Sequence, residues 1–296
     1  MEVFLKKFNL VSISDEEQFF REFRELNKYV FNTPYPLGLF TSKEFEEISF
    51  EPITIFYGGN GSGKTTLLNI IANKIHAERR NIDNRGQIFE KYVSKTECQL
   101  QNMKNCEEIK MISSDDVFDY LLDVRAINSG VNRRKDDLVE EYNNNRYGEN
   151  HIINALEEYD RLKKINSARN NTNRQYMREQ LRNNNIIQHS NGESALDFWQ
   201  EQIDKNGIYL LDEPENSLSA ENILKLKKYI EDSVRFYNCQ FIISTHSPFL
   251  LALNEARIYD LDEVPVSSKQ WYELKNMQIY YDFFKGYNDK FEKNED

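Results

Sequence analysis

Residues 58–65 read Gly-Gly-Asn-Gly-Ser-Gly-Lys-Thr and lie between the apolar run Ile53–Tyr57 and the periodic apolar segment Thr65–Ile75. They fit the pattern G-x-x-x-x-G-K-[ST], whose glycines allow successive backbone N–H groups to point at phosphate oxygens. The preceding run is short and β-branched, as in a buried strand, and the following segment has a wide apolar helical face. A strand, a glycine-rich loop and a helix N-terminus in this order predict a phosphate-binding loop.

Each residue type in this loop has a chemical reason. Lys64 would place a point charge between the β- and γ-phosphates of a nucleotide, and the Thr65 hydroxyl is a ligand for Mg²⁺. We therefore predict a Walker A loop that binds ATP with Mg²⁺. The expected nucleotide contacts are Gly58, Gly59, Asn60, Gly61, Ser62, Gly63, Lys64, Thr65 and Thr66.

A second apolar run, Ile208–Leu211, ends in two carboxylates. Asp212 is expected to hold Mg²⁺, directly or through water. Glu213 lies one residue further, where strand alternation aims it differently, and is the natural general base for an attacking water. Acids at a strand end are common by themselves, but together with the first loop they predict a Walker B motif.

Two shorter motifs flank this strand. Ser190-Asn191-Gly192-Glu193-Ser194 can be a capping box, with Ser190 as the N-cap and Glu193 three residues later. A capped helix start is also an anion site, so a structural and a phosphate-binding interpretation are compatible. Ser244-Thr245-His246-Ser247-Pro248 follows the apolar run Phe241–Ser244, and a lone histidine there can be structural or functional.

Taken in order, the loop, SNGES, LLDEPENSLS and STHSP resemble the motifs of ATP-binding-cassette (ABC) ATPases. The resemblance is to the non-transporter branch, which includes chromosome-maintenance, RecF-like and break-repair ATPases. It is nearest to small stand-alone prokaryotic ATPases labelled AAA-family or RecF/SMC-like, in whose pattern Lys110–Phe118 supplies a strand and a phenylalanine-containing helix. The similarity covers about residues 50–262.

The resemblance implies a composite site shared by two chains. Ser190, Gly192 and Glu193 would bind the γ-phosphate held by a second subunit, and Asn216–Ser219 would be the D-loop that crosses the interface. His246 would be the switch histidine that senses the γ-phosphate. The implied catalytic residues are Lys64, Glu213 and His246, in a head-to-tail homodimer that hydrolysis loosens.

The sequence departs from the family in two places. The signature is SNGES rather than SGGQ, and Ser114–Asp116 occupy the region where a Q-loop glutamine is expected. Gln87, Gln99 and Gln101 are alternatives without support. The segment between Lys64 and Ser190 is too short for the long coiled coils of chromosome-maintenance proteins.

Alternating strands and helices predict an α/β fold. The expected class is a P-loop NTPase, an ABC-ATPase-like head with a three-layer mixed or parallel sheet and a helical subdomain. Residues 1–296 would form one ATPase domain, with a helical lobe at about 110–200 that carries the signature motif. Residues 286–296 are polar and expected to fray.

Composition bears on the partners and the cellular location of the protein, but it indicates no substrate beyond ATP. The 296 residues carry a net charge of -11, which disfavours broad binding to nucleic acid, although Arg174, Arg178 and Arg182 could form one basic helical stripe. That stripe is either a solvated face or a phosphate contact. Three cysteines and no secretory or membrane-spanning pattern favour a cytoplasmic protein with reduced thiols.

The resemblance implies an ATPase in nucleic-acid repair or in phage and plasmid defence, with nucleic acid or an effector protein as a possible partner. Two alternatives stay open, which are the ATP-binding subunit of a membrane transporter and an ATP-gated binding module that does not hydrolyse.

Overall fold

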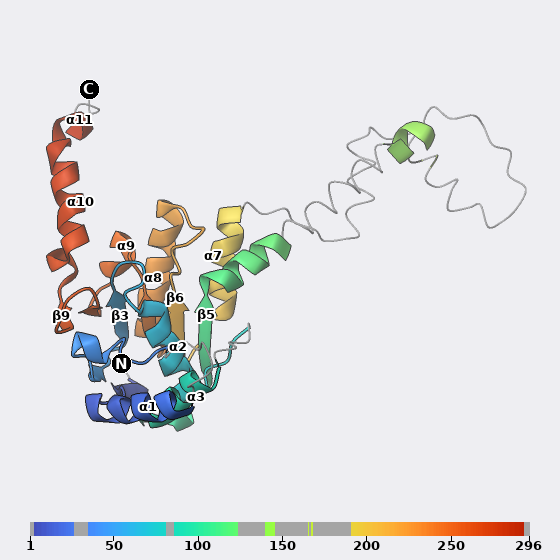
Figure 1. Ribbon diagram of the computed structural model, residues 1–296. Coiled ribbons are helices and arrows are strands. Elements are labelled where there is room, and N and C mark those ends of the chain that lie inside the picture. Colours follow the sequence, from blue (N-terminus) through green and yellow to red (C-terminus); the bar gives the residue numbers. More distant parts are fainter. Residues whose placement is uncertain are drawn as a thin grey trace, which may run out of the picture. The chain divides into compact units, whose positions relative to one another are not determined.

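The computed structural model describes residues 3–26, 35–80, 86–123, 140–145, 165, 167 and 191–292 (Figure 1). The chain divides into two compact units, one made of Met1–Phe118 with Ala195–Asp296 and the other of Asp119–Ser194. In the second unit, residues 119–123 and 140–145 are helical. The first unit contains the predicted Walker A and Walker B motifs.

A six-stranded sheet is the centre of the first unit. Its order is β5 (Glu108–Ser113), β6 (Gly207–Asp212), β7 (Gln240–Ser244), β3 (Ile53–Tyr57), β8 (Arg257–Asp260) and β9 (Ser267–Lys269). The first five strands are parallel, and β9 pairs antiparallel with β8. Every residue of β3, β6 and β7 is buried, as expected for central parallel strands covered on both faces. The predicted α/β class with a mixed sheet is confirmed.

Helices follow the central strands in the chain. They are α2 (Lys64–Lys74) after β3, an unlabelled helix over 114–123 after β5, α8 (Ala220–Phe236) after β6, and α9 (Pro248–Leu251) after β7. α7 (Asn191–Gln202) precedes β6. α2 packs against β6 and β7, and α8 against β7 and α9. The segments whose bounds the sequence predicts are confirmed to within one residue, and they are Ile53–Tyr57, Thr65–Ile75, Ile208–Leu211 and Phe241–Ser244.

A smaller antiparallel sheet, which the sequence patterns do not predict, packs beside α2. Its order is β2 (Glu47–Ser49), β1 (Leu5–Asn9) and β4 (Glu97–Leu100), and it is accompanied by α1 (Ile13–Leu26) and α3 (Gly86–Lys95). Its buried side chains share one core with Leu67, Ile70 and Ile71 of α2. The Gln240 amide joins the two sheets, because it accepts from Leu5 N (2.8 Å) and donates to Leu5 O (2.9 Å).

The chain continues past β9 through a short 3₁₀ turn, Trp271–Glu273, into α10 (Lys275–Gly286) and α11 (Asn288–Glu292). Figure 1 shows these two helices, in red, extending away from the sheet with α11 at the far end. Within the predicted tail of 286–296, therefore, residues 288–292 are helical, and 293–296 lie outside the described residues.

Two simpler expectations can be checked directly. Cys98, Cys106 and Cys239 are free thiols, as predicted. Over the described ranges, we find no helix with the length and hydropathy required to cross a bilayer.

Candidate nucleotide site

The phosphate-binding loop runs from the end of β3 into α2, and its glycines are needed for backbone conformation and for close packing. Gly61 and Gly63 have φ values of 81° and 102°, which side-chain-bearing residues rarely adopt. A Cβ on Gly63 would also lie 3.2 Å from Leu39 Cδ2, and one on Gly58 would lie 2.6 Å from Ser62 Oγ. The loop therefore requires glycine at 61 and 63 for its backbone conformation. It requires glycine at 58 and 63 because a side chain there would contact a neighbouring atom.

Lys64 lies at the first position of α2 and is 5% exposed. Its ammonium donates to the carbonyl oxygens of Gly58 (2.8 Å) and Gly59 (3.1 Å), and it lies 3.7 Å from Glu213 Oε1. The lysine thus curls back over its own loop. This places a positive charge against the carbonyl oxygens at the start of the loop.

Asp212 ends β6 beside the start of α2. The Thr65 hydroxyl donates to Asp212 Oδ1 (3.1 Å), and the Ser244 hydroxyl donates to the same oxygen. Burial raises the pKa of Asp212, while these two hydrogen bonds and Lys64 act to lower it. Two oxygen donors from different elements, Thr65 Oγ1 and Asp212 Oδ1, therefore meet at one point.

Glu213 follows directly in a left-handed conformation, with φ of 48°. Its backbone N–H donates to Ser244 O (3.0 Å), so β6 and β7 hold the turn from both sides. Its side chain is about one quarter exposed, accepts from Asn216 Nδ2 (3.1 Å) and lies 3.9 Å from His246 Nδ1. The carboxylate thus stands between Lys64 and His246 with access to solvent.

Glu215, two residues further, is a site residue that the sequence analysis missed. It is buried, and its Oε1 accepts hydrogen bonds from Thr245 Oγ1 (2.6 Å), His246 N (3.0 Å) and Ser247 N (3.2 Å). His246 Nδ1 lies 3.4 Å from the same oxygen. One buried carboxylate therefore fixes the backbone on which His246 stands. The acid-rich sequence DEPE was the only local signal, and it did not distinguish this role.

A hollow of about 730 Å³ opens beside the loop and Glu213, and its other wall is a segment that the sequence analysis did not identify. That wall is formed by 35–39 and Ser42. Tyr35 stacks on Phe89, with ring centroids 6.4 Å apart, and its hydroxyl shares a 2.6 Å hydrogen bond with Thr66 Oγ1. Pro36, Leu37 and Leu39 add an apolar surface next to the polar loop.

Asp262, in the turn after β8, is another site residue that the sequence analysis did not identify. Both of its carboxylate oxygens accept from Gly59 N–H, at 3.0 and 2.9 Å. The β8–β9 turn thereby holds the first half of the phosphate-binding loop. The Lys43 ammonium, which donates to Leu261 O, ties the same turn to the 35–43 segment.

The residues present fit a nucleotide with Mg²⁺. Ser62 Oγ, inside the loop, is buried without a hydrogen-bond partner among the described residues, which is unusual for a polar atom. Thr65 and Asp212 are the hard oxygen ligands that Mg²⁺ prefers, and Mg²⁺ commonly takes only one or two carboxylates when phosphates supply other ligands. In the described part of the chain there is no group of three or more His, Cys, Asp or Glu side chains placed to hold a metal ion.

The predicted signature motif is only partly described. α7 begins at Asn191, so Gly192 and Glu193 lie in its first turn, whereas Ser190 and the side chains of 191–194 lie outside the description. Arg174, Arg178 and Arg182 also lie outside the described residues. The contacts of these groups stay predictions.

The region expected to hold a Q-loop glutamine is instead a capping turn. Asp116 Oδ2 accepts from Ser113 N and Ser113 Oγ, both at 2.8 Å, at the junction of β5 and the helix 114–123. Gln101 donates to Val3 O (2.6 Å), and Gln99 lies in β4 of the antiparallel sheet. Both glutamines therefore belong to the framework.

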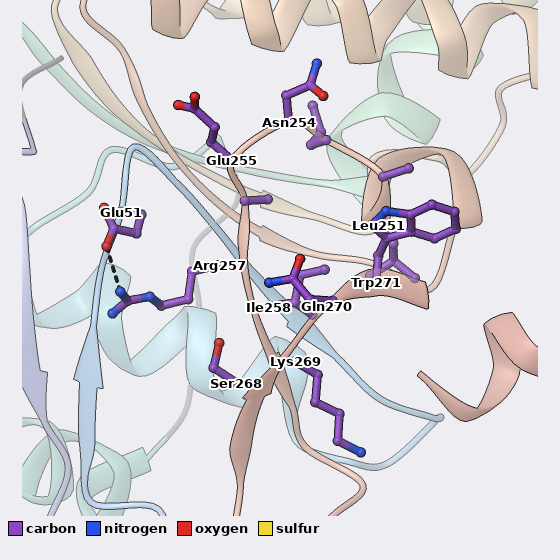
Figure 2. Close-up of a pocket in the computed structure, with 13 residues that line it drawn as sticks. Glu51, Leu251, Asn254, Glu255, Arg257, Ile258, Ser268, Lys269, Gln270 and Trp271 are labelled. Carbon is purple, nitrogen blue, oxygen red and sulfur yellow. Dashed lines mark hydrogen bonds and ion pairs between the residues drawn. The ribbon is translucent and has the colours of Figure 1, made fainter. Parts of the chain in front are cut away.

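A second hollow, of about 590 Å³, contains none of the predicted site residues (Figure 2). It is lined by the turn from Leu251 to Ile258, by 268–271, and by Glu51, which pairs with Arg257 at 2.7 Å. The Trp271 indole borders it near Leu251 (Figure 2). Because Glu51 and Arg257 neutralise each other, this pair offers no free positive charge that could bind a phosphate.

Fold and site together define the class of the protein, a P-loop nucleotide-binding α/β head. The sequence model of the family described as "ABC transporter" matches residues 47–216, more than half of the chain. The chain therefore belongs to this family, and it is an ABC-type ATPase domain by its fold and motifs. No curated protein gives a significant match.

Three of the solved structures that resemble the chain have low sequence identity to it. The SMC head domain from Thermotoga maritima is 12% identical, with a TM-score of 0.34, over 90% of this chain and 99% of that one. An SMC head domain bound to the C-terminal domain of ScpA, from Pyrococcus furiosus, is 13% identical, with a TM-score of 0.35, over 80% and 94%. A protein described as a metal-chelate type ABC transporter, inward-facing, is 14% identical, with a TM-score of 0.33, over 78% of each chain. The family assignment rests on the sequence match.

Proposed function

We propose that the protein binds and hydrolyses ATP, and that two copies pair head to tail over two ATP molecules. One observation carries this proposal, the convergence of a phosphate loop, a carboxylate at a magnesium position and a second carboxylate beside a histidine. Lys64 Nζ lies 3.7 Å and His246 Nδ1 3.9 Å from Glu213 Oε1, and Thr65 Oγ1 lies 3.1 Å from Asp212.

The residues of this chain divide the chemical work. The loop amides, Lys64 and Ser62 would bind the phosphates, and Thr65 and Asp212 would hold Mg²⁺, which neutralises phosphate charge when bound. The apolar wall at 35–39 would take the less polar end of the nucleotide. Bound phosphate oxygens would give the Lys64 ammonium an acceptor other than its own carbonyls.

Glu213 is the proposed general base. It lies within reach of solvent, and Asn216 and Lys64 hold its two oxygens in place. A base must stand next to both the water it activates and the phosphate that is attacked, and the carboxylate borders the hollow beside the loop. A module that only binds ATP does not need this group, which favours hydrolysis over the binding-module alternative.

The two-chain arrangement follows from the signature motif. The start of α7 at Asn191 is a helix N-terminus, and such ends attract anions. We propose that Ser190, Gly192 and Glu193 of one copy contact the γ-phosphate bound by the other, as the family resemblance implies. Loss of that phosphate would remove contacts present in only one state, so hydrolysis would open the dimer.

We propose a setting in nucleic-acid repair or defence, supported by the resemblance of DEPENSLS and STHSP to the non-transporter branch. ATPase activity of the purified protein, measured with and without DNA or RNA, tests this setting. Marked stimulation supports it. Stimulation by neither nucleic acid points to a protein partner.

Glu213→Gln tests the chemistry. We expect turnover to fall by about 10²- to 10⁴-fold, because the amide cannot accept a proton, while ATP binding is retained. Sedimentation of this variant with ATP and Mg²⁺ should reveal the head-to-tail dimer. Equal turnover in the wild type and the variant would remove Glu213 from the mechanism.

A further inference from the structure

Glu215 is a buried carboxylate whose two oxygens have unequal surroundings. Oε1 accepts from Thr245 Oγ1, His246 N and Ser247 N, whereas Oε2 is buried without a hydrogen-bond partner in the described part of the chain. A neutral amide oxygen could accept the same three bonds, so these bonds do not by themselves explain a buried charge. Because buried charges in proteins are normally paired, a carboxylate at this position indicates a further partner.

The further partner is the imidazole of His246. Among the described residues it is the only basic group within 4.0 Å of Glu215, with Nδ1 lying 3.4 Å from Oε1. The same oxygen accepts from the backbone N–H of His246 at 3.0 Å. One carboxylate oxygen therefore contacts both the main chain and the ring of the same residue. This double contact restrains the position of His246 and the rotation of its ring.

A second acid lies near the same ring nitrogen. Glu213 Oε1 is 3.9 Å from His246 Nδ1 and 3.7 Å from Lys64 Nζ, and the Glu213 side chain is 26% exposed against 7% for Glu215. Glu215 is closer to the ring and better shielded from water, which makes its interaction with Nδ1 the stronger of the two. Glu213, by contrast, shares its oxygen with Lys64 and faces solvent.

The two ring nitrogens of His246 have different environments. Ionised carboxylates only accept hydrogen bonds, so the nitrogen beside both acids, Nδ1, is the one that favours a proton. Nε2 has no hydrogen bond to any described residue, and half of the side chain is exposed. A neutral ring held in this way has its lone pair on Nε2. A second proton also binds at Nε2, which can then donate to a phosphate oxygen.

We propose that Glu215 is a positioning residue for ATP hydrolysis, because it holds the Nδ1–H of His246 and leaves Nε2 as the nitrogen that meets the γ-phosphate. This inference rests on the proposed function, in which His246 senses that phosphate. It assigns different work to two neighbouring acids. Glu215 orients the ring, and Glu213 stays available to take a proton from the attacking water.

Nuclear magnetic resonance of the ¹⁵N-labelled protein without nucleotide tests the orientation of the ring. Two-bond correlations at alkaline pH distinguish a proton on Nδ1 from one on Nε2, and the signals of His246 are those lost in His246→Gln. The wild type should show the Nδ1–H form. Glu215→Gln keeps an oxygen for the backbone but removes the charge, so the Nε2–H form should become the larger population. Glu213→Gln is the matched control, because its carboxylate is farther from Nδ1 and more exposed, and it should keep the Nδ1–H form.

A double-mutant cycle in ATP turnover tests the positioning role. Glu215→Gln should lower kcat about tenfold and change KM for ATP by less than about threefold, because the loop and the phosphate site are kept. In a His246→Ala background the same substitution should change kcat by less than about twofold, because no ring is left to position. His246→Gln, whose amide reaches the Nε2 position, should retain more turnover than His246→Asn, whose amide corresponds to Nδ1. Thermal melting checks that each variant is folded at the assay temperature.

The outcomes separate positioning from a purely structural role and from the proposed function. An Nε2–H form in the wild type, or equal tautomer populations in the wild type and Glu215→Gln, overturns the inference. An equal loss of kcat on Glu215→Gln with and without the His246 ring overturns it too. A wild type that does not hydrolyse ATP, or full turnover in Glu213→Gln, refutes the proposed function instead, and the resonance measurement still decides whether Glu215 sets the ring.

Discussion

Replacement of Glu215 by alanine should destabilise the protein severely, because this carboxylate organises the loop that carries His246. Its Oε1 accepts from Thr245 Oγ1, His246 N and Ser247 N, and the side chain is 7% exposed. Alanine leaves the His246 N–H and the Thr245 hydroxyl without their acceptor, whereas the Ser247 N–H keeps the Thr245 hydroxyl oxygen at 3.0 Å.

The magnitude follows from the number and type of these bonds. A hydrogen bond to a charged acceptor contributes about 1.5–3 kcal/mol, and an orphaned buried donor costs about 1–3 kcal/mol. The three bonds share one acceptor, so their effects do not add, and the total should resemble the loss of a buried charged network, about 3–5 kcal/mol. For a chain of this size, such a loss lowers Tm by roughly 10 °C.

Urea denaturation and thermal melting of the wild type, Glu215→Ala and Glu215→Gln provide the assay. Glutamine keeps one oxygen that can accept the same three bonds, so it should lose less than half as much stability as alanine. Glu213→Gln is the control, because the carboxylate it replaces is partly exposed and accepts one hydrogen bond from Asn216. It should change the free energy of unfolding by less than about 1 kcal/mol.

Two results would refute this reasoning. The first is a cost below about 1 kcal/mol for Glu215→Ala, which would mean that the loop holds without the carboxylate. The second is an equal loss in the alanine and glutamine variants. In that case, charge or packing, rather than hydrogen bonding to Oε1, would determine the stability of the loop.

Three further predictions concern other parts of the molecule. Gly63→Ala combines a φ of 102° with a Cβ 3.2 Å from Leu39 Cδ2, so ATP affinity, measured by calorimetry, should fall at least about tenfold. Gly61→Ala, which is strained but meets no atom within 4 Å, should lose less, and the reverse order would contradict the packing argument. Gln240→Ala orphans both backbone groups of Leu5 and should cost about 2–4 kcal/mol by urea denaturation; a cost under about 1 kcal/mol would show that the two sheets do not depend on this amide. Burial raises the pKa of Cys239 from 9.0 to about 11, so its thiol should resist alkylation at pH 8 until the protein unfolds. The free energy of unfolding should decline as pH rises from 9 to 11, because only the unfolded state releases this proton readily. Rapid labelling of Cys239 in the native protein, located by mass spectrometry, would show that the site opens.

The sequence alone determined the phosphate loop, the strands around it and the two acids that end β6. These features are local: eight consecutive residues specify the loop, and short apolar runs bounded by polar residues specify central strands such as Ile53–Tyr57. The family followed from the same motifs, because their order along the chain is a property of the sequence.

Only the tertiary structure decided which other residues join the site and which surface is left uncovered. Asp262 reaches Gly59 from about 200 residues away, and Tyr35 and Thr66 meet although they lie on separate elements. Glu215 looked like one acid among several until the fold placed Oε1 against the backbone of His246 and Ser247. The apolar pattern of α10 would suit a core helix equally well, and only the tertiary structure shows that Ile279, Tyr280 and Phe284 are about half exposed. Such contacts depend on the pairing of distant strands, which no local spacing encodes.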